Sequence, residues 1–168
     1  MVQKETLSSL THGNFAKELS NAVDFEKLVI GTFLIDKKGL DHSIDLLKPE
    51  VFYDPRHQEI FRAILKLYEN NHPVDMVTVI QELKRTEKLS LAGGDHYIID
   101  LTTVVSSSAH IEYHVRIILE KYILRSLINV SANVIDSSYK ESTDVFELLD
   151  KAEQGFFEIT NGTIKKGF

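Results

Sequence analysis

The longest uninterrupted helical pattern in the chain runs from Ala109 to Tyr139, with no glycine or proline inside it. At about 1.5 Å per residue, such a helix would be roughly 45 Å long, well beyond the mean globular helix of about three turns. Its apolar stripe is wide and drifts around the helix, so one neighbouring element would not cover all of it. The apolar positions are Ile111, Val115, Ile118, Tyr122, Leu124, Leu127, Ile128, Val134 and Ile135.

A second long helix is predicted after the short connection "KEST", with Ser142 or Thr143 as its cap. Its apolar positions are Val145, Leu148, Leu149, Ala152, Phe156 and Ile159. A connection this short joins antiparallel neighbours, so the two helices should form a hairpin. A broad apolar surface on such a hairpin favours a partner. Folding of the hairpin back onto the rest of the chain is the alternative.

The remainder of the chain also has helical spacing almost throughout. Asp54 and Pro55 are a good N-cap and first helical residue, and Asp75 is a second cap. The stretch "DKKG" (36–39) is typical of a turn. We therefore expect an all-α fold, a helical globular head followed by a long antiparallel helical hairpin. The expected organisation is a flexible N-terminal extension at 1–19, the head at 20–105, the hairpin at 106–161, and the start of a linker at 162–168.

The glycine pair Gly93-Gly94 invites comparison with phosphate-binding loops. A Walker A loop needs Gly-Lys-Ser or Gly-Lys-Thr at the start of a helix, whereas Asp95 and His96 follow here. A dinucleotide fingerprint needs a third glycine three residues on, where this chain has Tyr97. A bend between two helices is the better interpretation. Without a Walker A loop or catalytic constellation, we expect no enzymatic activity from this segment.

Composition and charge exclude several functions. The net charge is −6, from 19 basic and 25 acidic residues, which disfavours nonspecific DNA binding by this segment. No cysteine is available for a disulfide framework or a thiolate ligand. The sequence contains no run of signal-peptide or membrane-span length, so we expect a cytoplasmic protein without membrane contact.

His110 and His114 lie four residues apart with Glu112 between them, a near match to the zinc-protease motif. In that motif the glutamate directly follows the first histidine. Here it is displaced by one residue, about 100° around the helix. Surface or interface histidines are the better interpretation, so no metal site is predicted, and a zinc hydrolase is a remote hypothesis.

The order and spacing of several segments resemble the N-terminal domain of DnaB-type replicative DNA helicases, over about residues 21–161. Asp24, Phe25 and Glu26 stand where that family usually has Glu-Ala-Glu. The segments are "DFEKLVIGTFLID" (24–36), "LKPEVFYDPRHQEIFRAI" (47–64), "HPVDMVTVIQELK" (72–84), "LAGGDHYIIDL" (91–101), "HIEYHVRIILEKYILRSLI" (110–128) and "VFELLDKAEQGFFEI" (145–159).

The resemblance implies a role in DNA replication. Hairpins of this family pair between subunits and form a collar on a hexameric ring, from dimer to hexamer. The collar also meets primase and, in some members, the helicase loader. ATP and Mg²⁺ would belong to a downstream motor domain, which is also where single-stranded DNA would bind. No cofactor is expected in this segment.

Our first hypothesis is therefore an assembly and docking domain of a replicative helicase. A stand-alone helical adaptor or regulator with the same fold but no motor domain is the alternative. A Walker A loop beyond Phe168 in the reading frame would favour the first hypothesis, and a stop codon the second. The residues predicted for the subunit interface are Ile111, Val115, Ile118, Tyr122, Leu149 and Phe156.

Overall fold

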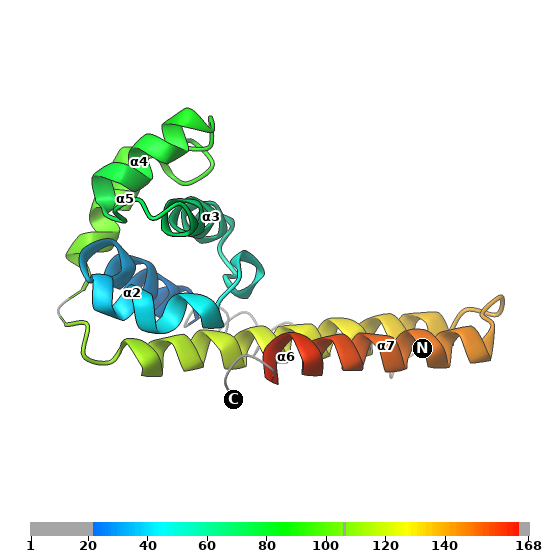
Figure 1. The fold of residues 1–168 in the computed structure, drawn as a ribbon. Helices are drawn as coiled ribbons and strands as arrows, with labels where there is room; N and C mark the ends of the chain where they lie inside the picture. Colours follow the sequence, from blue (N-terminus) through cyan, green and yellow to red (C-terminus); the bar gives the residue numbers. More distant parts are fainter. Residues whose placement is uncertain (1–21, 106, 165–168) are drawn as a thin grey trace. The chain divides into compact units, whose positions relative to one another are not determined.

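The computed structural model describes residues 22–105 and 107–164, with side chains through Gly162. Within these ranges the chain forms helices and turns and no strand, which confirms the expected all-α fold (Figure 1). The predicted extension at 1–19 and the last four residues of the predicted linker lie outside the described residues.

Contacts divide the chain into two units between Ile118 and Leu119. Unit 1 holds the predicted head together with the first two turns of the long helix α6 (Ile111–Ser138). Unit 2 holds the rest of α6 and α7 (Val145–Ile164). The division therefore lies inside the long helix, whereas the sequence suggested a boundary between residues 105 and 106.

Unit 1 begins with the helical residues 22–35. The short helices α2 (Lys37–Ser43), η1 (Ile44–Leu46) and η2 (Pro49–Val51) follow. The longer helices α3 (Pro55–Glu69), α4 (Met76–Arg85) and α5 (Gly94–Thr103) come next, and α4 packs against both α3 and α5.

Three aspartates start helices of unit 1. Asp54 accepts a hydrogen bond from the Arg56 amide, directly before Pro55, as the sequence predicted. Asp75 and Thr78 form a reciprocal capping box at the start of α4. The predicted turn at residues 36–39 is wrong, because Asp36 accepts a hydrogen bond from the Lys38 amide at 2.9 Å and α2 begins directly after it. The Asp36 carboxylate thereby satisfies one of the amides that the first turn of a helix leaves without an intrahelical partner.

The core of unit 1 lies between helix 22–35 and α3. Val29, Ile30 and Phe33 are completely buried, as are Ile60 and Phe61 of α3. The Phe33 and Phe61 rings lie 6.2 Å apart, within the range at which aromatic pairs attract each other.

Gly31 allows helix 22–35 to approach the end of α5 closely. A Cβ atom at this position would lie 2.1 Å from the carbonyl oxygen of Leu101 and 2.7 Å from Val105 Cγ2. No side chain fits there, because a backbone oxygen cannot move aside as a flexible side chain can.

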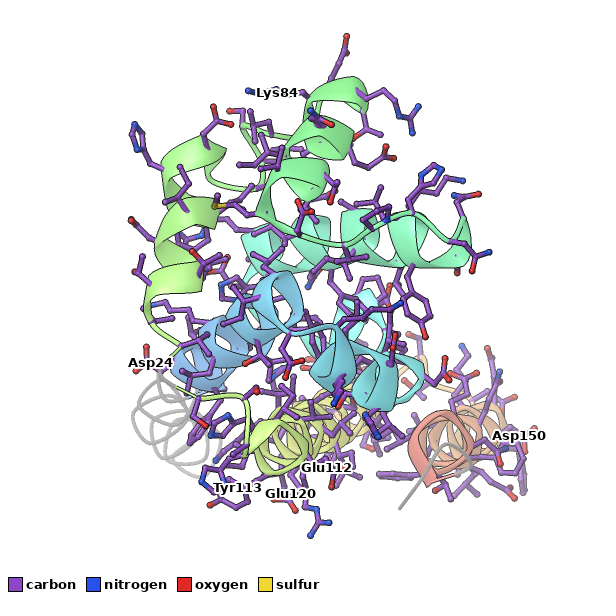
Figure 2. The ribbon with its side chains drawn as sticks, turned by 60° about the vertical axis from the view of Figure 1, so that its left-hand side comes forward. Asp24, Lys84, Glu112, Tyr113, Glu120 and Asp150 are labelled. Atoms are coloured by element: carbon purple, nitrogen blue, oxygen red, sulfur yellow. The ribbon has the colours of Figure 1, made fainter. Side chains whose placement is uncertain are left out.

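The glycine pair forms the bend between α4 and α5. Gly93 and Gly94 have φ angles of +93° and +82°, a conformation that other residues adopt only at a cost. Asp95 then lies 3.3 Å from the amine of Lys84 on α4, an exposed ion pair (Lys84 is labelled in Figure 2). The predicted bend is confirmed.

Unit 2 is a helical hairpin in which α6 and α7 lie side by side (Figure 1). A Cβ atom on Gly155 would lie 3.0 Å from Val130 Cγ1, so the glycine lets the two helices approach each other closely. In the turn, the Thr143 hydroxyl donates to the Ser137 carbonyl oxygen at 2.7 Å.

Two predictions for the ends of α7 are wrong. Asp144 caps the helix in place of Ser142 or Thr143, because its carboxylate accepts from the amides of Phe146 and Glu147 at 2.9 and 3.1 Å. The helix also continues through Gly162 to Ile164, into the residues expected to begin the linker.

Replacing Gly31 with alanine should destabilise unit 1 by about 2–3 kcal/mol, since the overlap with the Leu101 carbonyl is rigid. Alanine favours a helix over glycine by about 1 kcal/mol, so without the overlap the variant would be more stable. Urea unfolding followed by circular dichroism measures the difference. A free energy of unfolding equal to or above that of the unchanged protein would contradict the close packing.

Candidate functional site

The structure separates the residues predicted for the subunit interface into three groups by their burial. Ile111, Val115 and Ile118 are buried, with 7%, 1% and 1% of their surfaces exposed. Tyr122 is half-buried. The two predicted residues of α7 are exposed, Leu149 by 61% and Phe156 by 42%.

This difference changes which residues can meet a partner. The three buried isoleucine and valine side chains belong to unit 1 and present almost no surface. Their contribution to a subunit interface stays a prediction, one that would require unit 1 to open. Unit 2, in contrast, offers apolar surface directly.

The residues predicted for the interface did not include further exposed apolar side chains of unit 2. Leu124, Ile128 and Ile135 follow one another along α6 at intervals of four and seven residues. Val145, Leu149 and Phe156 repeat these intervals along α7. Intervals of four and seven keep residues on one face of a helix. The signal was therefore present in the sequence, although periodicity alone could not tell this face from a buried one.

We call these six residues the hairpin stripes. Between 38% and 66% of the surface of each side chain is exposed. An isolated exposed leucine is ordinary, but a repeated line of large apolar side chains on both helices of one hairpin indicates an interaction surface.

A buried polar network joins three elements of unit 1. Glu26 and His57 are both completely buried. One Glu26 oxygen accepts from the Tyr53 amide, and the other accepts from the Asp54 amide at 3.2 Å. That second oxygen also lies 2.7 Å from His57 Nδ1. Because a carboxylate can only accept, Nδ1 carries the proton, and in the neutral imidazole Nε2 accepts from the Tyr97 hydroxyl at 2.6 Å.

Arg56 covers the exposed side of this network. Its guanidinium lies 4.1 Å from the centre of the Tyr97 ring and bonds both oxygens of Asp54, the shortest contact being 2.6 Å. Burial alone would raise the pKa of Asp54, but the hydrogen bonds from Arg56 hold it below its ordinary value. Burial raises the pKa of Tyr97 to about 12, a shift that the charge of Arg56 opposes.

The order of Tyr97, His57 and Glu26 is like that of a proton relay, and His57 is completely buried at its centre. The hydrogen bonds of this network fasten helix 22–35 and α5 to the start of α3. The sequence did not reveal this network, because Glu26 and His57 are 31 residues apart and no local spacing relates them.

The histidine pair at the start of α6 has aromatic surroundings. The His114 ring lies 5.6 Å from Phe25 and 6.0 Å from Tyr113. Burial, and to a smaller extent the charge of His110, lower the pKa of His114. Among residues 22–105 and 107–164, no three histidine, aspartate or glutamate side chains gather where they could hold a metal ion.

A cleft of about 800 Å³ separates α2 from the turn between α3 and α4. Lys37, Asp41 and His72 line it together with the apolar side chains of Leu40 and Val74. Its charges are of both signs, so the lining favours no particular class of ligand. Within the described part of the chain, no helix is long and apolar enough to cross a membrane.

Comparison with known proteins identifies the family to which this chain belongs. The family model for the DnaB-like helicase N terminal domain matches residues 18–120. The chain belongs to this family. Its match ends close to the division between the two units, so it covers the head and the first turns of α6.

Curated relatives extend the match into the hairpin. Replicative DNA helicase DnaB of Rhodothermus marinus is 44% identical over 145 residues, 86% of this chain and 15% of the relative. Its counterpart in Geobacillus stearothermophilus is 34% identical over 139 residues, 83% of this chain and 31% of the relative. The chain thus spans between 15% and 31% of the length of these two relatives.

Solved structures share the fold. The N-terminal domain of DnaB helicase from Mycobacterium tuberculosis has a TM-score of 0.76 at 34% identity, over 81% of this chain and 96% of that one. The N-terminal domain of DnaB helicase from Helicobacter pylori, described with its interactions with primase, has a TM-score of 0.60 at 20% identity, over 74% of this chain and 98% of that one. A DnaB-like replicative helicase, likewise described with its interactions with primase, has a TM-score of 0.65 at 21% identity, over 83% of this chain and 30% of that one.

The raised pKa of Tyr97 predicts a loss of stability at high pH. The folded pKa of about 12 exceeds the ordinary value of 10.0, so between these pH values the unfolded chain releases a proton that the folded chain retains. Raising the pH through this window therefore favours unfolding. Tyr97→Phe removes the titrating group and should flatten the dependence. Urea unfolding at intervals from about pH 9 to 12 gives the free energy of unfolding of the unchanged protein and of Tyr97→Phe. If this free energy fell equally with pH in both proteins, the raised pKa of Tyr97 would be contradicted.

Proposed function

We propose that this chain is the assembly and docking domain of a replicative DNA helicase, and that its hairpin holds subunits together and presents a surface to primase. The observation that carries the proposal is the pair of hairpin stripes. The side chains of these stripes are exposed to solvent on both helices: Leu124, Ile128 and Ile135 of α6, and Val145, Leu149 and Phe156 of α7.

A second hairpin is the partner that these stripes fit best. Each stripe presents apolar residues at intervals of four and seven, the spacing at which helices interlock side by side. Two hairpins packed through such stripes would form a four-helix bundle, which buries on both copies what neither buries alone. Dimers built in this way would be the units from which a hexameric collar assembles.

The wider activity belongs to the longer protein of which this domain would be a part. The relatives are replicative helicases of greater length, which supports this proposal over a stand-alone adaptor. In that protein a motor domain would bind ATP and Mg²⁺ and grip single-stranded DNA, in the cytoplasm. The domain described here would contribute geometry and partner binding, and the helicase loader is a further candidate partner.

The buried positions of the predicted interface do not suit a test of assembly. An aspartate in place of Ile118, which is 1% exposed, would disrupt the interior of unit 1 and confuse loss of folding with loss of assembly. Exposed Leu149 avoids this difficulty, because a charged residue there costs little in the monomer.

Leu149→Asp should raise the dissociation constant for self-association at least about thirtyfold, the effect of roughly 2 kcal/mol at a buried interface position. Light scattering over a range of concentrations measures it, and circular dichroism checks that helicity is kept. Gln154→Asp, an exposed change on the same helix outside the stripe, is the matched control and should leave the mass unchanged. If the solution mass of Leu149→Asp equalled that of the unchanged protein at every concentration, the hairpin stripes would be ruled out as the assembly surface.

A further inference from the structure

Helix α7 carries three lines of residues that run along its length. The first line faces α6 and consists of half-buried residues, including Leu148 and Ile159, with Gly155 in close contact with Val130. The second line is the exposed stripe of Val145, Leu149 and Phe156 described above. The third line has no role so far.

This third line consists of Phe146, Asp150, Glu153 and Phe157, and we call it the acidic stripe. Phe146, Asp150 and Phe157 each follow a residue of the second line by one position, so the acidic stripe lies about 100° further around the helix. Phe146 is 79% exposed and Phe157 is 63% exposed. Figure 2 shows Asp150 on the edge of α7 that points away from α6.

The charge at the centre of the acidic stripe is not balanced within the described residues. Glu147, on another face of α7, pairs with Lys151 at 2.6 Å, and Glu158 accepts from Gln154 at 3.0 Å. Asp150 and Glu153 have no basic partner among residues 22–105 and 107–164. Two adjacent helical turns therefore present negative charge between two exposed aromatic rings.

This pattern disfavours a second copy of the same stripe. Two copies packed antiparallel about a two-fold axis would place Asp150 of one opposite Glu153 of the other, and two parallel copies would place each acid opposite its own equivalent. Like charges brought together at the centre of an interface are destabilising. The stripe with apolar residues throughout suits self-association, and the stripe with acids at its centre does not.

We propose that the acidic stripe binds a basic amphipathic helix of primase. The inference rests on the proposed function, since it assigns primase docking to one face of α7 and self-association to another. The complementary helix would place two lysines or arginines about one turn apart against Asp150 and Glu153. Apolar residues on either side would cover Phe146 and Phe157, which are separated by roughly 16 Å along the helix.

The two faces can be separated by experiment. Primase from the same organism is titrated against the unchanged domain and against Asp150→Lys with Glu153→Lys, by calorimetry at two salt concentrations. We expect the double variant to bind at least about tenfold more weakly, with a smaller dependence on salt. Phe146→Ala with Phe157→Ala should weaken binding as well, without altering the salt dependence.

The matched control is Glu147→Lys with Glu158→Lys, which changes the charge of the same helix by the same amount outside the stripe. It should bind primase within about twofold of the unchanged domain, and both double charge variants should keep the unchanged mass in light scattering.

Three outcomes would overturn the inference, and they are distinguishable. Absence of binding by the unchanged domain would remove primase docking from the proposed function and this surface with it. Equal binding by the unchanged domain and the acidic-stripe variant would overturn the inference alone. Equal weakening in the control, or an altered mass in the acidic-stripe variant, would show a general charge effect or a role of this face in self-association.

Discussion

The Glu26 carboxylate is the contact on which the arrangement of unit 1 depends. It is completely buried and accepts hydrogen bonds from the Tyr53 and Asp54 amides and from His57. These bonds place the start of α3, and through Tyr97 they place α5 as well. Removing one partner of a buried charge leaves the other unsatisfied, at a cost of several kcal/mol. A single side chain in the middle of a helix thereby orients two others.

Unit 2 differs from unit 1, because two helices alone cannot bury all of their apolar surface. Each helix of a hairpin turns only one line of residues toward the other, and in α7 that line contains Gly155, which brings the helices together. The other two lines of α7 are exposed in the hairpin. One of these lines is apolar, and the other is the acidic stripe, in which aromatic residues flank two acids. This difference indicates two kinds of partner, as a docking domain in a larger assembly requires.

The long helix α6 contributes residues to both units. In unit 1, Val115 and Ile118 of α6 are interior residues, whereas Leu124 and Ile135 of the same helix are exposed in unit 2. All four belong to one apolar pattern in the sequence. Their roles differ because the pattern drifts around the helix, and because different surroundings decide whether a given face is covered.

The sequence by itself determined the helical composition, the caps Asp54 and Asp75, the bend at Gly93 and Gly94, the hairpin and the family. The caps, the bend and the hairpin connection depend on residues that are near neighbours in the chain, and the family depends on the order and spacing of segments along it. Only the tertiary structure decided that Ile111, Val115 and Ile118 are core, that Glu26 meets His57, and that Asp144 rather than Thr143 caps α7. The first two outcomes depend on contacts between groups that are distant in the chain. The third depends on which of several neighbouring side chains forms the hydrogen bonds of the cap. Local periodicity carries no information about that.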